Sequence, residues 1–190
     1  MTTIFFTGHR ANKLCGWDGS KYEELAGQLV NLVEDLYSKG YDTFITGGAQ
    51  GIDQLVFWAV NTFKRRNPDK DVRNMVYSPF PGHESMWPKY GTFGQAEYRE
   101  MLAAADKVKY TLDRKPVTKQ KISQALYQRN VGMMHDSDAL CAFINDSELS
   151  DPNSHSGTKS AVNVAKRFNR KVTYVNYVID DDGMRITDVK

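Results

Sequence analysis

Three glycine-containing loops of this sequence combine residues that could bind an anion. Each follows an apolar, strand-like run, and the second and third lead into helical patterns. Glycine lets the backbone approach a ligand closely, and the free N–H groups and positive dipole end of a following helix attract phosphate or carboxylate. We therefore predict a ligand site whose candidate residues are Thr7, Gly8, His9 and Arg10 in the first loop, Thr46, Gly47, Gly48, Gly51 and Asp53 in the second, and Ser156, Gly157 and Thr158 in the third.

Each loop also has a purely structural interpretation. The stretch "GGAQG" matches neither the dinucleotide fingerprint nor a Walker loop. Gly47 and Gly48 could simply allow a tight turn with Asp53 capping the helix, and Ser156 could be an ordinary helix cap. A lone His9 after a strand is more often structural than catalytic, although followed by Arg10 it could form part of a phosphate clamp.

The elements that would position these loops alternate along the chain. Strand-like runs occupy residues 3–8, 41–48, 72–80, 107–112, 139–144 and 171–179, and helical patterns occupy 21–40, 51–66, 93–106, 118–138 and 157–169. Short strands separated by helices predict an α/β fold with a mostly parallel sheet covered on both faces, in a single domain over residues 1–190. The tail after residue 179 is typical of a turn plus an edge strand. Ligands of such sheets bind at the carboxyl ends of the strands.

Composition narrows the class of protein. The 190 residues suffice for one substantial core, and no run approaches the roughly 18 apolar residues of a membrane helix. The start "MTTIFFTGHR" indicates a first strand, not a signal peptide, so we expect a cytoplasmic protein. Cys15 and Cys141 are far apart, and we expect no disulfide. The formal net charge of +2 gives no global argument for nucleic acid or an anionic membrane, so an anion site must be local.

The helix predicted over residues 118–138 carries polar groups on two neighbouring stripes. Tyr127 and Asn130 share one face, and Arg129 and Asp136 share the next. Tyr127 could stack on a base, Arg129 could pair with phosphate, and Asn130 could hydrogen-bond a base or ribose. The alternative is that Arg129 and Asp136 are solvated or paired with each other and that Tyr127 is core.

The order of the motifs resembles that of the SLOG superfamily and, within it, the YpsA-like group. The resemblance rests on "TGHR", "GGAQGID", "YQRNVGMMHDSDALCAF" and "SGT" followed by "AVNVA", and it covers about residues 3 to 179. It implies a Rossmann-like sheet with a nucleotide-derived ligand over the glycine loops. Members of the superfamily include the LOG enzymes, the DNA-processing protein DprA and ligand-sensing domains of antiphage systems, so the fold leaves the function open.

The chain departs from LOG enzymes at the third loop. Their motif continues from Gly-Thr into acidic residues, one of which serves in cleaving the base from the ribose, whereas Lys159, Ser160 and Ala161 follow here. N-glycosidic cleavage needs a carboxylate. The remaining candidates are Asp53, Glu84, Glu97 and Asp136, and Asp53 is the best placed. A capping carboxylate at a helix N-terminus has a lowered pKa, however, and is a poor acid.

We therefore predict a binding protein for a nucleotide or nucleotide-derived small molecule, acting as a ligand sensor or sequestering protein. One alternative is an N-glycosidic enzyme, a hydrolase or transferase, with Asp53 as its catalytic carboxylate. The other is a DprA-like single-strand binder using the basic run from Lys107 to Lys121. The four histidines are too dispersed for a zinc site, and we predict no metal and no cofactor. Trp87 and Tyr90 could form a lid over a base or pack on the domain. We expect a homo-oligomer, in the simplest case a homodimer.

Overall fold

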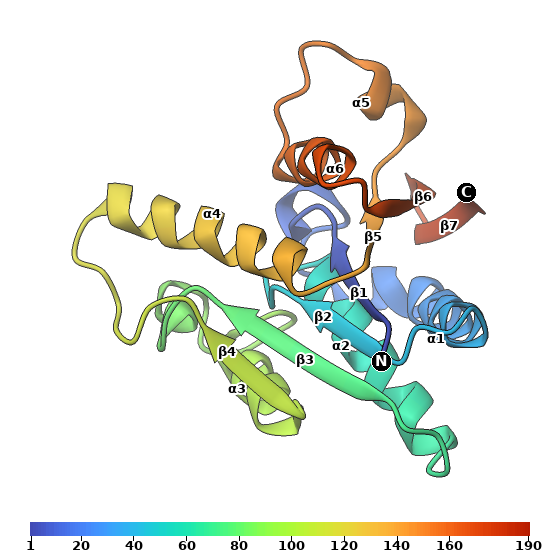
Figure 1. Cartoon of the computed structure of the whole chain (residues 1–190), viewed down its shortest axis with the longest axis horizontal. Helices are drawn as coiled ribbons and strands as arrows, with labels where there is room; N and C mark the ends of the chain where they lie inside the picture. Colours follow the sequence, from blue (N-terminus) through green and yellow to red (C-terminus); the bar gives the residue numbers. More distant parts are fainter.

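The structure, a computed structural model, describes all residues 1–190 and contains one seven-stranded sheet in the order β4-β3-β2-β1-β5-β6-β7 (Figure 1). All neighbouring strands are parallel except β7, which is antiparallel to β6. The strands are β1 (Thr3–Thr7), β2 (Thr43–Thr46), β3 (Arg73–Ser78), β4 (Lys107–Tyr110), β5 (Ala139–Phe143), β6 (Lys171–Asp180) and β7 (Gly183–Val189). The predicted α/β class, the mostly parallel sheet and the edge strand in the tail are confirmed.

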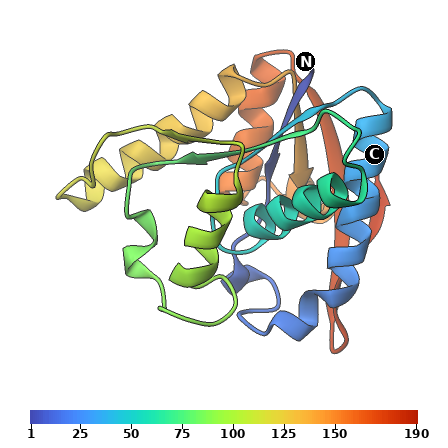
Figure 2. The same cartoon turned by 90° about the horizontal axis from the view of Figure 1, so that it is seen from below.

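Helices cover both faces of the sheet, as predicted (Figure 2). They are α1 (Glu23–Ser38), α2 (Ile52–Arg66), α3 (Gln95–Ala104), α4 (Lys119–His135), α5 (Asp146–Ser150) and α6 (Gly157–Arg167), with short 3-10 helices η1 (Ala11–Lys13), η2 (Gly19–Tyr22) and η3 (His83–Met86). Side chains alternate across β1: Ile4 and Phe6 pack with α1 and α2, whereas Phe5 packs with α4 and α6. A smaller apolar cluster joins Phe57 of α2 to Tyr98 and Met101 of α3.

The strand order creates a crevice beside β1. From β1 the chain moves outward through β2, β3 and β4, then returns to place β5 on the other side of β1. The loops after β1 and β5 therefore leave the sheet on opposite sides of a topological switch point, where open α/β sheets bind ligands. All three predicted loops end at this edge.

Two element boundaries differ from prediction for identifiable reasons. The helix predicted over residues 118–138 ends at His135, because Asp138 turns back to β1: its backbone N–H donates to Thr3 O (2.8 Å) and its carboxylate accepts from Thr3 N (2.8 Å). The first helix begins at Glu23 after the separate turn η2, which Asp18 caps. In addition, the loop predicted after β5 contains the short helix α5.

Two further expectations about the chain can be compared with the structure. Cys15 and Cys141 are both free, as predicted. None of the helices combines the length and the apolar character that a bilayer crossing requires.

Candidate functional site

A cleft of about 290 Å³ lies at the carboxyl end of β1. Residues from all three predicted loops and from α4 meet in its wall. Of the predicted site residues, those that line it are Thr7, Gly8, His9, Arg10, Asp53, Arg129, Asn130, Ser156, Gly157 and Thr158. Asn12, Lys13 and Ala49 also contribute, and Phe6, Leu126 and Met133 supply apolar surface. We call this space the cleft.

Gly8 and Gly51 bring the first loop against the start of α2. A Cβ on Gly8 would lie 2.6 Å from the Ile52 Cβ. Gly51 has a φ of +101°, and a Cβ there would lie 2.7 Å from the His9 carbonyl oxygen, which accepts a hydrogen bond from Ile52 N (3.4 Å). Glycine is needed at both positions because any side chain would push the two loops apart.

Gly47 leaves room for the buried Arg129 guanidinium. The Nη1 of Arg129 donates to the Gly47 carbonyl oxygen (2.9 Å), and a Cβ on Gly47 would lie 2.8 Å from the Arg129 Cζ. The same Cβ would lie 2.9 Å from Asp53 Oδ2. Gly47 therefore lies between a buried cation and a buried anion, with Arg129 only 7% and Asp53 only 6% exposed.

Asp53 does not cap α2. Its Oδ2 accepts from Ala49 N (3.2 Å) in the preceding loop. Burial raises the pKa of the Asp53 carboxyl, and the nearby Arg129 guanidinium and the Ala49 N–H oppose that rise. The expectation of a lowered pKa at this position was wrong, because desolvation outweighs the helix dipole for a carboxyl this deeply buried. The catalytic role of Asp53 in the N-glycosidic alternative remains a prediction.

Gly48 and Thr46 lie outside the cleft. Gly48 has a φ of +67°, and a Cβ there would lie 3.0 Å from both Met101 Cε and Tyr98 Cε2, so it faces α3. Thr46 is fully buried at the end of β2. Gly47 and Gly51 do not line the cleft either, so the ligand contacts predicted for these four residues of the second loop have no counterpart in its lining.

Two predicted residues of the α4 region also lie elsewhere. Tyr127 is 62% exposed and borders a shallow groove between α4 and α6. Asp136 accepts from Tyr77 Oη (2.7 Å) and Lys109 Nζ (2.5 Å). Partial burial raises the pKa of Asp136, but the hydrogen bonds from Lys109, Tyr77 and His135 outweigh it and hold the pKa well below its usual range. Asp136 is thus not paired with Arg129, and Tyr127 is not core.

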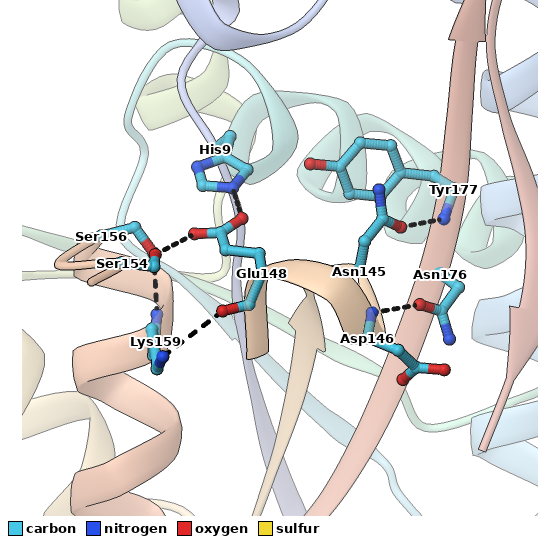
Figure 3. Close-up of polar contacts among 9 residues, drawn as sticks. All are labelled: His9, Asn145, Asp146, Glu148, Ser154, Ser156, Lys159, Asn176 and Tyr177. Atoms are coloured by element: carbon cyan, nitrogen blue, oxygen red, sulfur yellow. Dashed lines mark hydrogen bonds and ion pairs between the residues drawn. The ribbon is translucent and has the colours of Figure 1, made fainter. Parts of the chain in front are cut away.

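Glu148 of α5, which no sequence pattern singled out, also joins the site. His9 Nε2 lies 2.6 Å from Glu148 Oε2, and Ser154 Oγ donates to Oε1 (3.2 Å) (Figure 3). Burial raises the pKa of Glu148, yet hydrogen bonds from Ser156, His9 and Ser154 prevail and lower it. The loop has no regular spacing of apolar residues that would predict a helix. The one feature of the sequence that could have pointed to Glu148 is an acidic residue eight positions before Ser156.

Glu148 borders a second, more polar space beside the cleft. It has a volume of about 730 Å³ and is lined by His9, Lys13, Ser147, Glu148, Asp151, Ser154, His155, Ser156 and Tyr177. We call it the polar hollow. His9, Lys13 and Ser156 border both spaces.

Lys159 holds the loop between β5 and α6 in place. Its Nζ donates to the backbone carbonyl oxygens of Glu148 (3.4 Å) and Asp151. Its backbone N–H donates to Ser156 Oγ (3.1 Å), so Ser156 caps α6 while also lining the cleft. Lys159, which directly follows Gly157 and Thr158, thus anchors the loop that carries Glu148.

The segment after β3 packs on the domain. Trp87 makes edge-to-face contacts with Tyr98 (5.0 Å between centroids) and His83 (5.1 Å). Burial lowers the pKa of His83 to about 3. Tyr90 is exposed, and neither Trp87 nor Tyr90 lines the cleft. The loop was predicted either to form a lid over a base or to pack on the domain, and Trp87 packs on the domain.

The three loops converge beside β1, and Arg10 and Arg129 lie in the wall of the cleft between them. The resemblance to the SLOG superfamily implied such an arrangement. A model of the YspA SLOG family (YpsA) matches residues 4–182. The chain belongs to the YpsA SLOG family. The resemblance is confirmed, and the matched range includes every predicted site residue.

A curated relative extends the YpsA comparison. The chain is 29% identical over 151 residues to the uncharacterized SPbeta prophage-derived protein YoqJ of Bacillus subtilis (strain 168). The aligned region covers 76% of this chain and 81% of YoqJ.

No group of three or more His, Cys, Asp and Glu side chains in this chain is placed to hold a metal ion.

Proposed function

We propose that the chain binds a nucleotide or a nucleotide-derived small molecule in the cleft, as a ligand sensor or sequestering protein. The observation that carries the proposal is the charge of the cleft. Arg10, Lys13 and Arg129 line it together with a single carboxylate, Asp53. A cleft with this excess of cations, at the switch point of a parallel sheet, favours an anionic ligand.

The start of α6 adds a second source of attraction for an anion. Gly157 and Thr158 lie in its first turn and line the cleft, and Ser156 has already satisfied Lys159 N. The remaining N–H groups and the positive end of the helix dipole favour phosphate. A nucleotide phosphate here would lie within reach of the cationic side chains, and Asn130 supplies an amide for the nucleoside.

Thermal unfolding with a panel of nucleotides tests the proposal. A bound ligand at 100 times its Kd adds about 2.7 kcal/mol to the free energy of unfolding. Arg10→Lys keeps the charge but loses the bidentate fork, so it should weaken binding by about 1–3 kcal/mol. Arg65→Lys, at an exposed site on α2, is the matched control and should bind normally. A panel without any ligand-induced shift would refute the proposal.

One observation favours a second candidate, N-glycosidic cleavage. Glu148, whose Oε2 lies 2.6 Å from Nε2 of the cleft residue His9, would take the role of the carboxylate that is absent after Thr158. In hydrolysis, water adds to the anomeric carbon, the bond to the base breaks, and the water proton ends on the base. Free base in the same nucleotide incubations, abolished by Glu148→Gln or Asp53→Asn, would favour this enzyme over a pure binder.

The nucleic-acid alternative receives less support from the structure. The basic run includes the edge strand β4, and none of its residues lines the cleft. Lys109 is paired with Asp136, and Lys115 donates to Ser85 Oγ (2.8 Å). Such engaged lysines offer fewer free charges for phosphates.

A further inference from the structure

The polar hollow contains a buried tyrosine whose hydroxyl has no partner. Tyr177 on β6 is 9% exposed, and its backbone N–H donates to Asn145 Oδ1 (2.8 Å) while its hydroxyl bonds to no residue of the chain. Figure 3 shows that this hydroxyl points toward the side on which His9 and Glu148 lie. The Tyr177 ring is largely buried while its hydroxyl opens onto the hollow, where it is free to donate a hydrogen bond to a ligand.

Glu148 presents a fixed carboxylate to the same space. His9 and Ser154 each take one of its oxygens, and a carboxylate has about four lone-pair sites, so acceptor capacity remains. Because Lys159 bonds the Glu148 and Asp151 carbonyl oxygens, the loop is held before any ligand arrives. Burial, reinforced by the Glu148 charge, raises the pKa of Tyr177 to about 12, so its hydroxyl is a donor at neutral pH.

These groups select a ligand by their chemistry. The two carboxylates Glu148 and Asp151 outnumber the one lysine of the lining, Lys13, which disfavours a second phosphate. Tyr177 is the single hydrophobic residue of the lining, which disfavours an extended apolar group. A ring with several hydroxyls suits the site, because the hydroxyls donate to carboxylates and accept from Tyr177, while the apolar ring face packs on an aromatic. The shared border at His9, Lys13 and Ser156 allows one ligand to occupy both spaces.

We propose that the polar hollow is a sugar subsite, which binds the pentose of a ligand whose phosphate lies in the cleft. This inference rests on the proposed function, since it takes the phosphate position from it. It assigns Glu148 and Tyr177 to recognition of the sugar, and Arg10 with the start of α6 to recognition of the phosphate.

Titration calorimetry with two phosphate monoesters tests the subsite. Ribose 5-phosphate should bind the full chain at least about tenfold more tightly than methyl phosphate, a ratio that corresponds to about 1.4 kcal/mol. Tyr177→Phe should bring that ratio toward one and leave the methyl phosphate affinity unchanged, and Glu148→Gln should also bring the ratio toward one. Asp146→Asn, on the same short helix but outside the hollow, should retain the full ratio.

The outcomes distinguish a failure of the sugar subsite in the polar hollow from a failure of nucleotide binding in the cleft. Equal affinities for the two monoesters would overturn the sugar subsite and leave phosphate binding in the cleft intact. Binding of neither monoester, together with a nucleotide panel without response, would overturn the proposed function itself. If Glu148→Gln lowers the unfolding temperature because it disturbs His9, the nearly isosteric Tyr177→Phe decides, since its hydroxyl supports no contact within the chain.

Discussion

At the scale of single residues, the buried Arg129 shows how the site is built. Its guanidinium donates to Gly47 O and to Asn130 Oδ1 (2.9 Å), which fixes the side chain at the wall of the cleft. Burial lowers the pKa of Arg129 and the Asp53 charge opposes this. Such a buried, preorganised cation loses little side-chain entropy when an anion binds.

Asp136 should contribute to stability and not to ligand binding. Its pKa is lowered in the folded state, so its contribution is present above the unfolded pKa of about 3.9 and is lost as pH falls below that value. Asp136→Asn should cost about 1–2 kcal/mol at pH 7, discounted because the carboxylate is partly exposed, and the difference from wild type should shrink below pH 4.

Chemical denaturation at several pH values measures the effect of this change. Asp113→Asn, at an exposed aspartate, is the control and should be nearly neutral. A nucleotide-induced stabilisation that vanished in Asp136→Asn would contradict this assignment and return Asp136 to the ligand site.

At the scale of elements, the loop between β2 and α2 packs against the wall of the cleft on one side and against α3 on the other. Gly47 admits Arg129, whereas Gly48 packs beneath Tyr98 and Met101. The two adjacent glycines are therefore needed for different reasons. Their common effect is to let β2 end and α2 begin within five residues.

Gly48→Ala should destabilise the fold by about 1–3 kcal/mol, because alanine is strained at positive φ and its Cβ would press on α3. Gly27→Ala provides the control: Gly27 is exposed within α1, a Cβ there has nothing within 4 Å, and the change should stabilise by about 0.5–1 kcal/mol. Urea unfolding of both variants is the measurement. Equal stability of Gly48→Ala and wild type would show that the turn relaxes freely.

At the scale of the whole molecule, the distribution of charge bears on whether the ligand is a small anion or a nucleic acid. The net charge is only +2, and the cations that matter for the proposal are gathered in the cleft. The basic run lies on the β4 edge and at the start of α4, where Lys119 and Lys121 are exposed.

Reversing Lys119 and Lys121 to Glu should leave nucleotide binding unchanged, since neither residue lines the cleft. Acidic residues are favourable in the first turn of a helix, so the fold should tolerate the change. Fluorescence anisotropy with a single-stranded oligonucleotide at several salt concentrations is the matching measurement. Strong, salt-dependent binding that the double reversal removed, with Arg10→Lys unaffected, would favour the DprA-like alternative.

The sequence determined the fold class and the three loops of the cleft. Continuous apolar runs indicate strands buried on both faces, helical stripes indicate the buried face of each helix, and glycines after apolar runs mark where the chain leaves the sheet. Patterns of this kind involve residues close together in the chain, so they can be recognised without knowing how the elements pack. They also placed Arg10, Ser156 and Arg129 at one end of the molecule.

Only the tertiary structure decided which residues face the cleft. Gly47 and Gly48 are neighbours in the chain but face opposite environments, because a single positive φ turns the backbone between them. Glu148 and His9 are separated by 139 positions and meet because β5 returns to the side of β1. The pKa of Asp53 likewise depends on its burial, which no local pattern encodes. Long-range contacts of this kind depend on the strand order, and the strand order is a property of the whole chain.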